Sequence, residues 1–125
     1  MPLERLDHVN VRTANLRAMT DFYQRVVGLK PGQRPPFSFS GAWLYLGDQA
    51  VLHLVETESP PAGAEPKIEH FAFRATGIDR FIARLETSSV SYRRATVPAT
   101  GLEQVHFSDP DGNHVEVGFP PMTAA

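Results

Sequence analysis

The sequence has no cysteine, which excludes disulfide bonds, thiolate metal ligands and cysteine nucleophiles and is typical of a reducing compartment. It also has little excess charge, with a formal net charge of -2 at pH 7, so nothing indicates a nucleic acid or an anionic membrane surface as a partner. No apolar run approaches the roughly 18 residues of a membrane span, and residues 1–5 lack the charged and apolar blocks of a signal peptide. We therefore expect a cytoplasmic protein whose metal ligands, if it has any, are His, Asp or Glu.

An internal repeat organises the chain. Residues 6–12 read Leu-Asp-His-Val-Asn-Val-Arg and residues 68–74 read Ile-Glu-His-Phe-Ala-Phe-Arg, at an offset of 62 (68 minus 6). Both stretches alternate between apolar and polar positions with period two, so both are predicted strands. With 125 residues, 42% of them hydrophobic, the chain is long enough for one domain with its own core. We expect a single domain, 1–125, made of two similar modules.

The same order of predicted elements follows each copy of the repeat. Apolar residues at spacings of three and four predict one helix at about 14–27, which Gly28 ends, and a second at about 78–86. A pair of strands joined by turn residues follows each helix, and a weaker strand precedes each pair. The paired strands are expected at 42–46, 50–55, 104–108 and 114–119, and the weaker ones near 30–36 and 91–97. Each module is therefore predicted to be βαβββ.

Proline marks the boundary between the modules. The segment 57–66 contains three prolines and is predicted to be a stiff, extended linker between module 3–56 and module 67–120. The single helix of a module covers one face of its sheet, so the other face has to be covered by the other module or by a second chain. The predicted fold class is α+β.

Strand alternation places four potential metal ligands on the sheet faces that no helix covers. His8 and His53 have this parity in the first module, and His70 and Glu116 have it in the second. The repeat pairs them, because His8 and His70 are 62 residues apart (70 minus 8) and His53 and Glu116 are 63 apart (116 minus 53). Imidazole and carboxylate suit a divalent Zn, Ni, Co, Mn or Fe(II) ion, and four ligands leave up to two octahedral positions for substrate or water. The four residues are candidate ligands of one ion per site.

Four motifs cover nearly the whole chain and carry a resemblance to a known family. They are Leu-Asp-His8-Val, Asp21-Phe22-Tyr23 followed by Val27-Gly28-Leu29, Ile-Glu-His70-Phe, and Asp109-Pro110-Asp111-Gly112-Asn113-His114-Val115-Glu116. In order and spacing they resemble the vicinal oxygen chelate superfamily, which includes glyoxalase I, extradiol dioxygenases, methylmalonyl-CoA epimerase, fosfomycin-resistance enzymes and bleomycin-resistance proteins. The resemblance implies two βαβββ modules that form a cup-shaped mixed β-sheet with helices on the outer face and a metal in the cup. It also implies a homodimer in which the first module of one chain pairs with the second module of the other.

The resemblance places His8, His70 and Glu116 at the superfamily's first, third and fourth ligand positions. At the second position glyoxalase I carries Glu and the epimerase carries Gln, whereas this chain has His53. Glu56 is the alternative second ligand. It has the parity of the apolar residues of its strand, so it would point towards the helix unless a bulge shifts the strand.

The activity that the resemblance implies is metal-dependent chemistry on a small substrate that chelates the metal through neighbouring oxygens. Glu116 is the carboxylate available as ligand or base, and a glyoxalase I-like lyase or isomerase, or a dioxygenase, is expected. The alternative is a non-catalytic, drug-binding protein of the bleomycin-resistance type, which typically lacks the metal ligands. Polar and aromatic candidates for the substrate pocket are Asn10, Trp43, Tyr45, His106 and His114.

Overall fold

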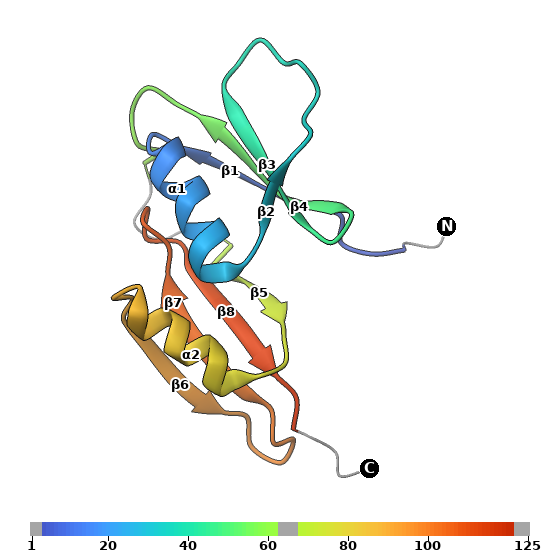
Figure 1. The fold of residues 1–125 in the computed structure, drawn as a ribbon, viewed down its shortest axis with the longest axis vertical. Coiled ribbons are helices and arrows are strands. Elements are labelled where there is room, and N and C mark those ends of the chain that lie inside the picture. Colours follow the sequence, from blue (N-terminus) through green and yellow to red (C-terminus); the bar gives the residue numbers. More distant parts are fainter. Residues whose placement is uncertain (1–3, 63–67, 122–125) are drawn as a thin grey trace. The chain divides into compact units, whose positions relative to one another are not determined.

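The computed structural model of the chain describes residues 4–62 and 68–121 and is drawn in Figure 1. The chain divides into two compact units, unit 1 (Met1–Gly63) and unit 2 (Ala64–Ala125). Both units have the predicted βαβββ order of elements. Residues 3 and 67, at which the predicted modules begin, and residues 63–66 of the predicted linker lie outside the described residues. The linker therefore stays a prediction.

Unit 1 is built on a four-stranded mixed sheet with the strand order β1-β4-β3-β2. Its elements are β1 (Val9–Thr13), α1 (Leu16–Phe22), the π-helical turn η1 (Tyr23–Val27), β2 (Lys30–Gly32), β3 (Gly41–Leu46) and β4 (Gln49–Glu56). β1 runs parallel to β4, whereas β3 is antiparallel to both of its neighbours. The helix predicted at 14–27 is confirmed as α1 and η1 together.

Unit 2 repeats this topology with the strand order β5-β8-β7-β6. Its elements are β5 (His70–Arg74), α2 (Ile78–Thr87), β6 (Tyr92–Thr96), β7 (Glu103–Ser108) and β8 (His114–Phe119). β5 is parallel to β8, and β7 is antiparallel to β6 and β8. Within residues 4–62 and 68–121, none of the helices has the length and apolar composition that crossing a membrane requires.

The apolar stripes of the two helices build the two cores. α1 contacts β3 and β4 in unit 1, and in unit 2 the ring of Phe81 on α2 lies 5.7 Å from the rings of Phe107 and Phe119. Fully burying a large apolar side chain stabilises a fold by about 1.5–3 kcal/mol. The buried set includes Met19, Tyr23, Val26, Leu44, Leu52 and Leu54 in unit 1, and Ile82, Leu85, Val105, Val115 and Val117 in unit 2. Side chains alternate between the two faces of a sheet, so the residues next to the buried strand residues lie on the opposite faces.

The turn between β7 and β8 fixes where β8 begins. The Oδ1 atom of Asp109 accepts hydrogen bonds from the backbone N–H groups of Asp111 and Asn113, both at 2.9 Å, and Oδ2 accepts one from Nδ2 of Asn113 at 2.8 Å. Gly112 has a φ of 88°, a left-handed conformation that favours glycine. Turn residues thus join β7 and β8, as the sequence predicts for the strands at 104–108 and 114–119. Asp109 is buried and organises this turn.

Candidate metal centre

In unit 1 three aromatic side chains form a stack, one from β3, one from β4 and one from the residue before β1. Trp43 and His53 are partners in the strand register, and their ring centroids lie 4.0 Å apart with 12° between the planes. The rings of His53 and His8 are 3.9 Å apart with 8° between the planes. Asn10, the register partner of His53 on β1, is exposed beside them. The structure therefore brings two predicted ligands and two predicted pocket residues together on one sheet face.

Each histidine of this stack uses one ring nitrogen in a local contact. Nδ1 of His8 lies 2.8 Å from Oδ2 of Asp7, and Nε2 of His53 lies 3.1 Å from the carbonyl oxygen of Ala50. Since these oxygens accept, His8 donates from Nδ1 and keeps the lone pair on Nε2, while His53 keeps it on Nδ1. Burial, and then the nearby His8, lower the pKa of His53, which favours the neutral ring that a metal binds.

The stacking sets a condition on metal binding by His8 and His53. An imidazole nitrogen binds a metal in the plane of its ring, at about 2.0–2.1 Å. Two rings with centroids 3.9 Å apart and nearly parallel planes cannot both have one ion in their planes at that distance. Binding of one ion by both residues therefore requires one ring to rotate out of the stack.

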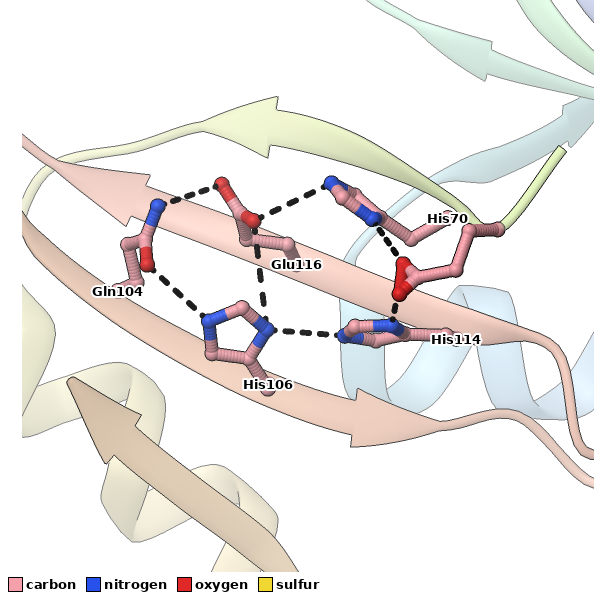
Figure 2. A network of polar contacts seen from close by, with 6 residues as sticks. His70, Gln104, His106, His114 and Glu116 are labelled. Atoms are coloured by element: carbon pink, nitrogen blue, oxygen red, sulfur yellow. Dashed lines mark hydrogen bonds and ion pairs between the residues drawn. The ribbon is translucent and has the colours of Figure 1, made fainter.

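In unit 2 six side chains form a closed ring of polar contacts, which Figure 2 shows across β5, β8 and β7. Nε2 of His70 lies 3.5 Å from Oε1 of Glu116, and Nδ1 of His70 contacts Oε1 of Glu69. The same Glu69 oxygen lies 3.2 Å from Nδ1 of His114. The other half of the ring runs from Nε2 of His114 to Nδ1 of His106 at 2.8 Å, from Nε2 of His106 to Oε1 of Gln104 at 3.2 Å, and from Nε2 of Gln104 to Oε2 of Glu116 at 3.2 Å.

The spacing of His70 and Glu116 fits two ligands of one cation. Metal bonds of about 2.0–2.2 Å place neighbouring ligand atoms about 3.0–3.6 Å apart, which includes the 3.5 Å between Nε2 of His70 and Oε1 of Glu116. The hydrogen bond to Glu69 raises the pKa of His70, so a metal would compete with a proton for Nε2. That same bond turns Nε2, and not Nδ1, towards Glu116. The residues present thus fit a divalent ion at this end of the sheet.

A second donor set shares His70. Ligand atoms of Glu69, His70 and His114 all lie within 4.8 Å of one another. The Glu69 side chain is 71% exposed, however, whereas that of Glu116 is 13% exposed. Glu116 is therefore the carboxylate better shielded from water, and Glu69 is better placed to orient His70 and His114 than to bind a metal in a shielded site.

Two other predicted residues, Tyr45 and Glu56, have different surroundings. The hydroxyl of Tyr45 donates to the carbonyl of Gln33 at 2.6 Å, which ties this predicted pocket residue to the segment after β2. Glu56, the alternative second ligand, is exposed at the last residue of β4. A bulge does occur between β3 and β4, but at Leu44 and Tyr45, near the other end of β4.

Three residues of these networks are absent from the predicted site. Asp7 and Glu69 each precede a histidine in the two copies of the repeat and each contact its Nδ1, a recurrence that the sequence already displays. Gln104 has the parity of His106 on β7, which places both on the face of Glu116. The acid-histidine pairs of the repeat could have identified Asp7 and Glu69, and strand parity could have identified Gln104.

A comparison with protein families identifies the superfamily of this chain. A family model described as the Glyoxalase/Bleomycin resistance protein/Dioxygenase superfamily matches residues 5–117. The chain belongs to this superfamily. The resemblance that the four sequence motifs carry is thereby confirmed.

Individual proteins and solved structures are also similar to this chain over most of its length. Over 123 residues the chain is 34% identical to "Glyoxylase I 4" of Arabidopsis thaliana, in an alignment that covers 92% of this chain and 70% of that protein. The crystal structure of lactoylglutathione lyase from Agrobacterium tumefaciens has a TM-score of 0.69 and 25% identity, with 95% of this chain and 96% of that chain covered. A glyoxylase/bleomycin resistance protein/dioxygenase domain from Frankia sp. EAN1pec has a TM-score of 0.79 at 18% identity, with 96% and 100% covered, and shows the shared fold. The predicted α+β fold of βαβββ modules is confirmed.

Proposed function

We propose that this protein is a divalent-metal-dependent enzyme, a glyoxalase I-like lyase or isomerase, with His8, His53, His70 and Glu116 as the metal ligands. The observation that carries the proposal is the pair formed by Nε2 of His70 and Oε1 of Glu116, 3.5 Å apart, with both side chains held by further polar contacts. The similarity to proteins named as glyoxalase I and lactoylglutathione lyase supports the reaction class.

The proposed substrate is a small hemithioacetal with two neighbouring oxygens. A bound divalent ion would polarise these oxygens and stabilise the negative charge that develops when the adjacent carbon loses a proton. Glu116 is the proposed base, because it is the only carboxylate among the four ligands. It would take the proton from one carbon and return it to the next, so that the hemithioacetal becomes a hydroxy thioester without loss of atoms.

His53 favours this lyase chemistry over dioxygenation. A non-haem Fe(II) dioxygenase needs open metal positions for both the organic substrate and oxygen, and typically uses two His and one carboxylate. A fourth protein ligand would occupy one of those positions. Trp43, stacked on His53, would provide an aromatic wall beside the substrate.

The test is metal-dependent turnover. Protein treated with chelator and reloaded with Zn, Ni, Co or Mn is mixed with an α-oxoaldehyde and a thiol, and the thioester is followed by its ultraviolet absorbance. Glu116→Gln should lose at least about 100-fold in kcat, as expected for removal of a general base. Glu86→Gln, the same change at an exposed position of α2, should retain wild-type turnover. Turnover unaffected by metal removal, or by Glu116→Gln, would contradict the proposal.

We further propose that the protein is a homodimer with pairing of modules between chains, as the superfamily resemblance implies. Light scattering at micromolar concentration tests this. A particle of twice the 13.8 kDa chain mass is expected, and a monomer contradicts it.

A further inference from the structure

We infer that Gln104, held in place by His106, is a positioning residue that presents the Oε1 atom of Glu116 to the metal. The inference rests on the proposed metal site. It concerns which oxygen of Glu116 binds and what holds that carboxylate in its orientation, and it adds two residues that the predicted ligand set does not include.

The carboxylate fixes the direction of the hydrogen bonds. An ionised Glu116 only accepts, so the Gln104 atom that lies 3.2 Å from its Oε2 is the amide nitrogen. The amide oxygen of Gln104 then faces Nε2 of His106 at 3.2 Å and accepts from it. A neutral His106 is thus protonated on Nε2, and its unprotonated Nδ1 faces Nε2 of His114 at 2.8 Å. This tautomer of His106 satisfies the contact with Gln104, whereas the other tautomer leaves two acceptors facing each other there.

The strand register explains why Gln104 reaches Glu116. The direct partner of Glu116 on β7 is His106, and the direct partner of Gln104 on β8 is Gly118. Gln104 thus lies diagonally opposite Glu116 on the same sheet face, and its amide extends along that face to the carboxylate. The equivalent face of unit 1 holds His53 differently, by stacking it on its register partner Trp43.

This arrangement makes the two oxygens of Glu116 different. Oε2 accepts from Gln104, while Oε1 lies 3.5 Å from Nε2 of His70 and 4.0 Å from Nδ1 of His106. The side chains of Glu116 and His106 are only 13% and 12% exposed, so water has limited access to replace the amide. A hydrogen bond to one oxygen removes rotational freedom that metal binding would otherwise have to restrict. Gln104 therefore favours binding of the metal through Oε1 alone.

The first experiment measures metal affinity. Zn²⁺ and Ni²⁺ are titrated by calorimetry into the full chain, prepared metal-free, as wild type, Gln104→Leu, Gln104→Ala and Gln24→Leu. Loss of a residue that orients a ligand typically weakens metal binding about 10–100-fold, and this is expected for both Gln104 variants. Gln24→Leu makes the same change at an exposed position of η1 and should bind like wild type. Circular dichroism establishes that each variant is folded, and the Ala variant serves if the Leu variant is not.

The second experiment reads the tautomer of His106 without metal. Nitrogen-15 NMR of the histidine rings should find the proton of neutral His106 on Nε2 in the wild type, and should find that preference reduced in Gln104→Leu. A wild type that binds metal no more tightly than the Gln104 variants overturns the inference and leaves the proposed function standing. A wild type that binds neither metal contradicts the proposed function instead, and a proton on Nδ1 of His106 overturns the inference in either case.

Discussion

Replacing His53 with Ala is expected to weaken the fold of unit 1 even in metal-free protein. The ring lies between those of His8 and Trp43, at 3.9 and 4.0 Å, and its Nε2 donates to the carbonyl of Ala50 at 3.1 Å. Two aromatic pairs at about 0.5–1.5 kcal/mol each and one hydrogen bond of about 0.5–1.5 kcal/mol give an expected loss of about 1.5–4.5 kcal/mol in the free energy of unfolding.

Urea unfolding in the presence of chelator, followed by far-ultraviolet circular dichroism, measures this loss. Glu56→Ala is the matched control, since Glu56 lies on the same strand but is exposed at its end, and its effect should stay within about 0.5 kcal/mol. An equally small effect of His53→Ala would refute the argument that the ring is held in a stack. The same two variants separate the alternatives for the second ligand, because His53→Ala should weaken metal binding and Glu56→Ala should not.

Three further predictions concern the two units separately. Trp43 is the only tryptophan and stacks on His53, so its fluorescence should change if metal binding rotates His53 out of the stack, and unchanged emission at saturating metal would contradict rotation of His53. Burial, and secondarily the nearby His8, lower the pKa of His53 in the folded protein. The contribution of the neutral His53 ring to stability is therefore fully present above the ordinary histidine pKa of about 6.5, and it is lost as the pH falls through the lower pKa of the folded state. The urea midpoint of wild type should therefore fall more on acidification than that of His53→Gln, and parallel pH profiles would argue against it. In unit 2, Leu85→Ala removes a side chain that is 0% exposed and should lower the free energy of unfolding by about 2–5 kcal/mol, measured by calorimetry or urea unfolding. A loss below about 1 kcal/mol would show that the surrounding side chains fill the cavity.

The order of elements could be predicted because it depends on local patterns. Period-two alternation in 6–12 and 68–74 and the apolar spacing of 78–86 each determine a face within one element. Trp43 and His53 were separate candidates in the sequence, and the strand register of β3 and β4 makes them direct partners. The predicted ends of the elements were less accurate. The first strand was predicted within 6–12, whereas β1 begins at Val9 and ends at Thr13. The π-helical turn η1 depends on the backbone contacts of Gly28 and Leu29 with the carbonyl of Tyr23, which no spacing of apolar residues specifies.

The contacts that hold the candidate ligands could not be predicted in the same way. Asp7 and Glu69 reach the neighbouring histidine because they precede β1 and β5, where strand alternation no longer separates adjacent side chains. The contact of Gln104 with Glu116 depends on the cross-strand register of β7 and β8, which sequence parity alone leaves open. The stacking of His8 on His53 depends on side-chain rotamers, which periodicity does not determine.

Metal content tests the central proposal most directly. Protein purified without chelator and analysed by elemental mass spectrometry should contain close to one divalent ion of Zn, Ni, Co, Mn or Fe per chain. The double variant His8→Ala/His70→Ala, which removes one proposed ligand from each unit, should lose that ion. A metal-free wild type, or full occupancy in the folded double variant, would contradict the proposed site.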